Sequence, residues 1–276
     1  MIMRRLFVAF IAALIMPAFA YSQHDIKVIS YNIQNSEVKN GTNSWGYRYG
    51  ASADMFFDQN ADVMALQEPL QDQMYFIAQN FPNYKSVGKG AEDGKEKGEY
   101  TAIVYNKKTI SVVNWGMFWL SDTPDVPSKG WDAAQNCTAT WALLKHKTTG
   151  KKFYLVNTDL DQNGRESRKM GVQLILDKIA EINKDSLPVV LAGGFDMRSS
   201  DASLAVVESA MKNARSSAPK TDNTGTYNNW GKNSDVLDHI YFSGFASCSE
   251  YQTITKKYSD RKFISDHFPI AAYLTF

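Results

Sequence analysis

Short runs of apolar residues, many of them β-branched, recur along this chain and predict strands. The runs cover residues 26–33, 62–68, 100–105, 110–119, 138–145, 153–159, 187–194, 235–243 and 269–276. Apolar positions at spacings of three and four predict helices instead. The clearest helix covers residues 165–184, with shorter ones at 50–59 and 71–80; the apolar stripe of the long helix is Val172, Ile175, Ile179 and Ile182.

Polar and glycine-containing segments separate these elements. Residues 40–43 and 216–225 predict turns or loops, and the glycine-rich, charged segment 89–98 predicts a mobile loop. Strands and helices follow no strict βαβ order, and no linker or long repeat divides the chain. The pattern therefore predicts one α/β domain, a four-layer α/β sandwich in which two mixed β-sheets pack face to face with helices outside.

The N-terminus carries the pattern of a secretory signal. Two arginines precede a charge-free apolar run over residues 6–20, which closes on Ala18-Phe19-Ala20. This run is shorter than the ~20 apolar residues that a membrane span requires, and an uncleaved anchor is the alternative interpretation. No later stretch is apolar enough for a span. We therefore expect residues 1–20 to be a signal peptide and residues 21–276 to be exported.

Composition and charge narrow the choice of partners. Hydrophobic residues make up 44% of the chain, enough for a large core. The 30 basic and 29 acidic residues leave a net charge of +1, so the basic surplus typical of proteins that bind long nucleic acids is missing. Two cysteines, Cys137 and Cys248, either pair in an exported protein or remain buried thiols in their apolar segments.

Several polar residues lie at the ends of apolar strands, where packing alone gives no reason for them. They are Asn32, Glu68, Asp159, Asp196, Asp238 and the pair Asp266-His267. Each one taken singly is typical of a turn or a helix cap. Together, carboxylates at strand ends converge on one rim of a sandwich, where oxygen ligands can hold a hard cation. The set predicts a metal-binding site at such a rim.

The order of these short motifs resembles the endonuclease/exonuclease/phosphatase superfamily of metal-dependent phosphoesterases. The resemblance extends over nearly all of residues 21–276, and residues 118–124 are similar to an exported bacterial subgroup. The motifs are Tyr31-Asn32-Ile33, Leu66-Gln67-Glu68, Gly98-Glu99-Tyr100, Val156-Asn157-Thr158-Asp159, Gly193-Gly194-Phe195-Asp196, Leu237-Asp238-His239-Ile240 and Ser265-Asp266-His267. Each motif is short, but all of them stand in the order of the superfamily.

The resemblance implies a role for each matching residue. Glu68 would be the principal ligand of Mg²⁺, or of Mn²⁺ or Ca²⁺, with Asn32 and Asp266 close to the metal or its waters. Asp238 would orient His267, which would contact the scissile phosphate, because a carboxylate fixes the imidazole tautomer and favours its charged form. Glu99 would line the substrate site. Trp230, in a polar stretch, is a candidate for stacking on a substrate, with packing at the rim as the alternative.

Two positions depart from the superfamily pattern. Asp159 stands where the resemblance implies a histidine on the phosphate, and Gly194 stands where it implies the aspartate that helps to activate water. The loss of a general base typically costs ~10²–10⁴ in rate. Asp196, two residues beyond Gly194, is one candidate to reach the empty space, and Asp159 with Asp196 and Glu68 is a candidate cluster for a second or larger cation.

Two functions therefore remain open at this point. The first is an exported bacterial hydrolase, periplasmic or secreted, that cleaves a phosphodiester or phosphomonoester weakly or in an altered way. The second is a pseudoenzyme whose former cleft binds a phosphorylated ligand, a carbohydrate or a protein partner. The expected substrate is a phosphorylated small molecule or a phosphodiester rather than long nucleic acid, and the expected oligomeric state is a monomer.

Overall fold

The structure is a computed structural model that describes residues 25–276, and its strands form two six-stranded sheets. The signal peptide expected at residues 1–20 lies outside the described part of the chain. The first sheet has the order β11-β12-β1-β2-β4-β3. Its strands are β1 (Ile26–Asn32), β2 (Val63–Gln67), β3 (Tyr84–Val87), β4 (Thr101–Asn106), β11 (Ser247–Thr253) and β12 (Ile270–Thr275).

The second sheet has the order β5-β6-β7-β8-β10-β9. Both sheets are mixed, because β1 pairs with β2 and β7 pairs with β8 in parallel, while the other pairs are antiparallel. The strands of this sheet are β5 (Ile110–Trp119), β6 (Thr138–His146), β7 (Lys152–Asp159), β8 (Val189–Gly194), β9 (Lys212–Asn213) and β10 (Asp238–Ser243).

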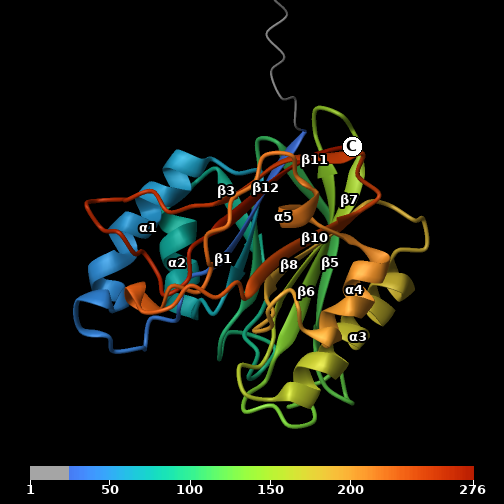
Figure 1. Cartoon of the computed structure of the whole chain (residues 1–276), viewed down its shortest axis with the longest axis horizontal. Coiled ribbons are helices and arrows are strands. Elements are labelled where there is room, and N and C mark those ends of the chain that lie inside the picture. Colours follow the sequence, from blue (N-terminus) through green and yellow to red (C-terminus); the bar gives the residue numbers. More distant parts are fainter. Residues whose placement is uncertain (1–24) are drawn as a thin grey trace, which may run out of the picture.

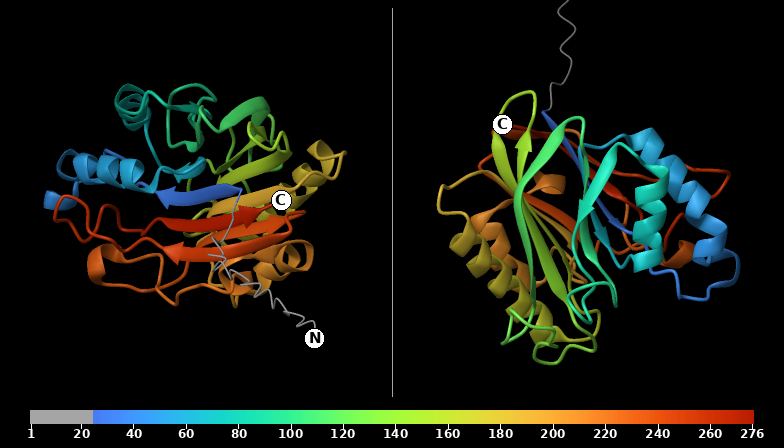
Figure 2. Two further views of the ribbon diagram at one scale, coloured as in Figure 1. Left: turned by 90° about the horizontal axis from the view of Figure 1, so that it is seen from above. Right: turned by 180° about the vertical axis from the view of Figure 1, so that it is seen from behind.

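Helices cover the outer faces of the paired sheets, and the four-layer prediction is confirmed. Figure 1 shows α1 and α2 on one side of the sheets and α3 and α4 on the other, and the view from behind in Figure 2 agrees. The helices are α1 (Trp45–Gln59), α2 (Gln71–Asn80), α3 (Arg165–Ile182), α4 (Ala205–Ala210) and α5 (Ala214–Ser217), with short 3₁₀ turns at Gly41–Asn43, Ala202–Leu204 and Asn229–Gly231.

Three apolar clusters hold the four layers together. One fills the space between the sheets, where Val63 of the first sheet and Leu155 of the second belong to the same cluster. Another lies under α1 and includes Met55, and the third lies under α3 and includes Ile175. Removing such side chains from water stabilises the fold by about 1.5–3 kcal/mol each.

A buried amide network joins the two sheets next to the strand ends that carry the site. The Gln67 side chain at the end of β2 donates to Asn157 Oδ1 of β7 at 2.7 Å, and Asn157 Nδ2 donates to Leu66 O at 2.8 Å. Both side chains are fully buried. Because buried amides must keep their partners, this network fixes the end of the second sheet relative to the first.

Several details differ from the sequence-based expectations. Helix α1 begins at Trp45 rather than at residue 50, and three strands (β3, β9 and β11) and two short helices (α4 and α5) were not predicted. β3 is short, and only one of its four residues is fully buried, so its apolar pattern is weak. The segment 89–98, predicted to be a mobile loop, is folded into hydrogen-bonded turns, in which Gly90 and Glu92 donate to Lys95 O and Lys97 O at 3.0 Å.

The disulfide alternative is wrong, because both cysteines are free and buried. Cys137 belongs to the cluster under α3, whereas Cys248 belongs to the cluster between the sheets, so the second sheet separates them. No helix within residues 25–276 has the length and apolar content that a bilayer span requires.

Candidate active site

The first part of the site lies where β1 and β2 end. These parallel strands place Asn32 beside Gln67, and Glu68 follows directly with a φ of 67°. The left-handed backbone turns the Glu68 side chain out of the alternation of the strand. Asn32 Nδ2 then donates to Glu68 Oε1 at 2.7 Å, so two of the predicted residues are in direct contact.

Glu68 is a half-buried carboxylate whose direct hydrogen-bond donors are neutral, although the charge of His267 also acts on it. The Asn35 backbone N–H donates to its second oxygen at 3.3 Å, and within residues 25–276 no lysine or arginine pairs with it. Burial, followed by the nearby carboxylates of Glu99 and Asp266, raises the pKa of Glu68 to about 7, against the smaller lowering effects of the Asn32 hydrogen bond and the charge of His267. A proton or a bound metal cation would each stabilise this carboxylate.

Glu99 and Asp266 complete this acidic region, and amide side chains hold both of them. Glu99 accepts from Asn35 Nδ2 at 2.6 Å and from Gln135 Nε2 at 3.2 Å. Asp266 accepts from Gln34 Nε2 at 2.6 Å. Burial raises the pKa of Glu99 as well. Neutral donors thus orient the carboxylates without neutralising their charge.

His267 and Asp238 form the second part of the site. His267 Nδ1 lies 2.8 Å from Asp238 Oδ2, and both side chains are almost fully buried. Thr226 Oγ1 donates to the same carboxylate oxygen at 2.5 Å. Burial lowers the pKa of His267, but the charge of Asp238 and its hydrogen bond more than offset this and raise it to about 10. His267 is therefore a cation in the neutral pH range, with Nε2–H as its second donor.

The third part of the site is a row of three residues across neighbouring strands. Gly194 of β8 pairs with Asp159 of β7 on one side and with Asp238 of β10 on the other. A Cβ atom at Gly194 would lie 2.4 Å from Asp159 Oδ1 and 4.0 Å from Asp238 Oδ1. The Asp159 carboxylate therefore occupies the space that a side chain at position 194 would take.

The idea that Asp196 fills the space at Gly194 is wrong. β8 ends at Gly194, and Asp196 has a left-handed φ of 50°, so the extended conformation that would align the two residues is lost. Asp196 still lies near enough to the site for the charge of His267 to lower its pKa and for that of Asp238 to raise it. Burial is the larger effect and brings the pKa of Asp196 to about 6.

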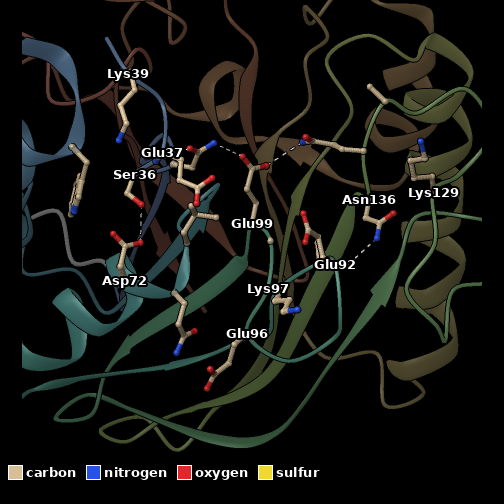
Figure 3. Close-up of a pocket in the computed structure, with 18 of the residues that line it drawn as sticks. Ser36, Glu37, Lys39, Asp72, Glu92, Glu96, Lys97, Glu99, Lys129 and Asn136 are labelled. Atoms are coloured by element: carbon tan, nitrogen blue, oxygen red, sulfur yellow. Dashed lines mark hydrogen bonds between the residues drawn. The ribbon is translucent and has the colours of Figure 1, made fainter. Parts of the chain in front are cut away.

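Two cavities open beside these residues. The smaller one, of about 260 Å³, is lined by Glu68, Glu99 and Asp266. The larger one is a groove of about 1030 Å³ that shares Asn35, Glu99 and Gln135 with it. Figure 3 shows Glu99 in the middle of this groove, between the two amide side chains that donate to it.

The structure brings most of the predicted residues to one rim, but it also adds residues that the sequence did not reveal. Trp230 is half-buried and lines neither of the two cavities. Tyr227, from the same loop, lies with its ring centroid 4.8 Å from that of His267. The residues missed from sequence are Gln34, Asn35, Gln135, Thr226 and Tyr227. All five lie in loops. Four of them are Asn, Gln or Thr residues that donate hydrogen bonds to carboxylates of the site, and Tyr227 packs against His267.

The donor set fits a hard divalent cation of the kind that the resemblance implies. Within residues 25–276, no three His, Cys, Asp or Glu side chains already converge on one point as a preformed metal site. Glu68 and Asp266 nevertheless supply carboxylate oxygens at the same cavity, and Asn32 orients Glu68 through its Nδ2 while its own Oδ1 accepts from the Gln34 backbone N–H. Such oxygen ligands, with waters in the remaining positions, are typical of Mg²⁺ and Ca²⁺.

Comparison with known proteins identifies the family. The model of the Endonuclease/Exonuclease/phosphatase family matches residues 29–267. This span includes every residue of the site described above and all strands of the two sheets except β12 and the start of β1. The chain therefore belongs to the Endonuclease/Exonuclease/phosphatase family.

Individual relatives share the fold over almost the whole chain. The mannosyl-6-phosphatase Bt3783 of Bacteroides thetaiotaomicron VPI-5482 is 33% identical, with a TM-score of 0.85 over 91% of this chain and 100% of that one. An endonuclease/exonuclease/phosphatase from Bacteroides vulgatus is 29% identical, with a TM-score of 0.86 over 91% and 98% of the two chains. The uncharacterized protein L388 of Acanthamoeba polyphaga mimivirus is 27% identical over 251 residues, 82% of this chain and 90% of its own length.

Proposed function

We propose that this protein is an exported, divalent-metal-dependent phosphatase that removes phosphate from a small polyhydroxylated molecule such as a sugar phosphate. One observation carries the proposal: the buried Asp238–His267 ion pair and the half-buried Glu68, which no lysine or arginine pairs with in residues 25–276, lie at one rim, and the Glu68 cavity adjoins an open polar groove. A cation for the phosphate and an anion for the metal are the two charges that phosphate-ester hydrolysis requires.

In this proposal Glu68 holds the metal, with Asp266 and Asn32 close to the metal or its waters. The bound metal supplies stabilisation of the negative charge that grows on the phosphate oxygens. Asn32 and the Asn35 backbone aim the Glu68 carboxylate at the cavity through hydrogen bonds of 2.7 and 3.3 Å. Gln34 does the same for Asp266 at 2.6 Å.

His267 binds the phosphate on the side of the second sheet. Its Nδ1–H is held by Asp238, which leaves Nε2–H to donate to a phosphate oxygen. Thr226 holds the same Asp238 oxygen, so the ring orientation is fixed before the substrate binds. A fixed cationic donor costs no reorganisation when charge develops on the phosphate.

The groove favours a small hydroxylated leaving group over a nucleic acid. It contains the carboxylates of Glu37, Asp72 and Glu92 and the lysines Lys39 and Lys97, as Figure 3 shows. Such an alternation of acceptors and donors suits hydroxyl groups, whereas a polyanion needs a basic surface. The resemblance to the mannosyl-6-phosphatase of B. thetaiotaomicron supports the same substrate class.

Export is part of the proposal and has its own test. The basic start, the apolar run and Ala18-Phe19-Ala20 support removal of residues 1–20 by a signal peptidase. Expression of the whole chain in a bacterium, followed by N-terminal sequencing of the periplasmic fraction, should give a mature protein that begins near Tyr21. A protein found only in the membrane fraction with Met1 intact would contradict export by this route.

The activity is tested with substrates from three classes. Mannose 6-phosphate, bis-p-nitrophenyl phosphate and a single-stranded oligonucleotide are each assayed with Mg²⁺, Mn²⁺ and Ca²⁺. We expect metal-dependent release of phosphate, fastest from the sugar phosphate, and loss of this activity in Glu68→Gln but not in the control Glu208→Gln, a surface residue of α4. Tight binding of the sugar phosphate without turnover under any metal would instead support the pseudoenzyme.

A further inference from the structure

The two departures from the family pattern face each other across neighbouring strands. Asp159 is the last residue of β7, Gly194 is the last residue of β8, and the parallel register pairs them directly. They are 35 positions apart in the chain, and nothing in the sequence connects them. Their contact in the fold makes one structural feature out of two substitutions.

The side chain of Asp159 requires a glycine at position 194. A Cβ atom there would lie 2.4 Å from Asp159 Oδ1, far inside the van der Waals distance. No backbone atom lies among the three nearest contacts, and Gly194 does not have a positive φ. A side chain at position 194 is therefore excluded by Asp159 and not by the backbone.

The neighbouring Gly193 provides the contrast. Its φ is 150°, and a Cβ atom there would lie 1.9 Å from the backbone oxygen of Thr158. Here the backbone itself demands glycine, so a smaller residue at position 159 would give no relief. The two consecutive glycines thus have different causes, and only Gly194 depends on a side chain across the strand.

The surroundings of Asp159 are those of a reactive group and not of a structural one. Within residues 25–276, no donor forms a hydrogen bond with its carboxylate, whereas Glu68, Glu99 and Asp238 all have such partners. Asp159 is half-buried and lines a narrow space with Glu99. Carboxylates with a structural role normally have hydrogen-bond donors as partners. A carboxylate without such a partner next to a cavity is free to accept a hydrogen bond from a bound molecule.

We propose that Asp159 is the carboxylate that orients the attacking water and accepts its proton. Gly194, which has no side chain, leaves the room that the Asp159 carboxylate needs in this position. The two substitutions together place a carboxylate on β7, whereas the family pattern has one at the neighbouring position of β8. This inference rests on the proposed phosphatase function. Under this inference the substitutions at positions 159 and 194 form one rearranged active site and are not two independent losses of catalytic residues.

The proposed step is balanced as follows. The water oxygen forms a bond to phosphorus, and the water proton passes to Asp159. The ester P–O bond breaks, its electron pair stays on the leaving oxygen, and that oxygen takes a proton from solvent. Asp159 then releases its proton to solvent, and the enzyme returns to its starting state.

The first test replaces Asp159 without changing its shape. Asp159→Asn should lower kcat by ~10²–10⁴ with KM changed less than about threefold, because the amide still fills the space but accepts no proton. Its melting temperature should stay close to that of the natural protein. Unchanged kcat in Asp159→Asn would overturn the inference.

The second test moves the carboxylate back to β8. Gly194→Asp should lose both activity and stability, because its side chain meets Asp159. The double variant Asp159→Ala with Gly194→Asp should regain the melting temperature and at least about tenfold in kcat over Asp159→Ala alone, since one carboxylate is again present. In the matched control, Gly193→Ala should be destabilised whether or not Asp159 is replaced.

The outcomes separate this inference from the proposed function. If the natural protein turns over, Glu68→Gln abolishes turnover, and the Asp159 and Gly194 effects are additive in both kcat and melting temperature, the inference is overturned and the phosphatase function stands. If the natural protein hydrolyses no phosphate ester with any metal, the proposed function fails and the inference fails with it.

Discussion

The two sheets contribute to the site in different ways. The rim of the first sheet consists of Asn32 and Glu68, with Asp266 beside them, and each carboxylate there is held by amide donors. The rim of the second sheet consists of Asp159, Gly194 and Asp238, with His267 above Asp238. One of its carboxylates is paired with a cation, and another has no donor in the described chain.

The comparison shows where the chemistry has changed and where it has not. The first rim keeps the residues that the family pattern implies for metal binding, and its amide donors fix their orientation. The second rim keeps the His267–Asp238 pair but carries both substitutions, and these fit each other in space. In the proposed mechanism the substitutions change how water is handled and remove one histidine that the family pattern places on the phosphate, while Glu68, Asp266 and His267 are retained.

The largest effect should follow a change at the first rim. Glu68→Gln keeps the hydrogen bond from Asn32 but removes the negative charge that holds the metal. We expect kcat/KM to fall by at least ~10³, and Mn²⁺ binding measured by calorimetry to disappear. Glu208→Gln should change neither quantity. Metal binding that survives in Glu68→Gln would assign the cation to the second rim.

A smaller, pH-dependent effect should follow a change at the second rim. Asp238 raises the pKa of His267 to about 10 against an ordinary value of 6.5, so the cation that binds phosphate persists until the pH rises through about 10. In Asp238→Asn the His267 pKa falls, and activity should disappear as the pH rises through about 7, with a loss at pH 8 of roughly 10–100-fold.

The control for this prediction is Asp235→Asn. Asp235 pairs with Arg198 at the surface, three residues before Asp238, and its loss should leave the pH profile of kcat/KM unchanged. An alkaline limb at the same pH in Asp238→Asn and in the natural protein would show that His267 is not the phosphate-binding cation.

A modest effect should follow from removing one of the two side-chain amides that donate to Glu99 between the rim and the groove. Asn35 and Gln135 hold Glu99 from opposite sides, and all three line the groove. Because one such hydrogen bond contributes about 1 kcal/mol, Gln135→Ala should raise KM for a sugar phosphate about fivefold. KM for p-nitrophenyl phosphate, which has no hydroxyl groups on its leaving part, should change little. An equal rise for both substrates would contradict a groove that binds the sugar.

The smallest effect concerns the stability of the metal-free protein. The folded pKa of Glu68 is about 7, above its ordinary value of 4.5, so the folded state binds more protons than the unfolded state between these values. The contribution of Glu68 to the stability of the natural protein must therefore fall as the pH rises from 4.5 through 7. With a chelator present, Glu68→Gln should melt roughly 3 °C higher than the natural protein at pH 8 and at the same temperature at pH 4.

Added Mn²⁺ should reverse that order, because only the natural protein binds it. Identical melting temperatures of the two proteins at pH 8, with and without metal, would mean that Glu68 is neither strained by burial nor relieved by a cation.

Much of the fold could be predicted from the sequence, because its strands are apolar runs and α3 has a regular stripe. The strand-end position of Glu68 and Asp238 likewise predicted their meeting at a rim. The amide donors Asn35 and Gln135 could not be predicted, because they lie in loops whose path is set by tertiary contacts. The contact of Asp159 with Gly194 was also out of reach, since it depends on the register of β7 against β8.

The comparison of the two rims is tested most directly by a crystal structure of the natural protein with Mn²⁺ and inorganic phosphate, using the anomalous signal to locate the metal. The account predicts a Mn²⁺ peak in contact with Glu68 and Asp266, and a phosphate that lies between this metal and His267 Nε2. A Mn²⁺ peak held by Asp159 and Asp196 instead, or a phosphate that does not contact His267, would contradict it.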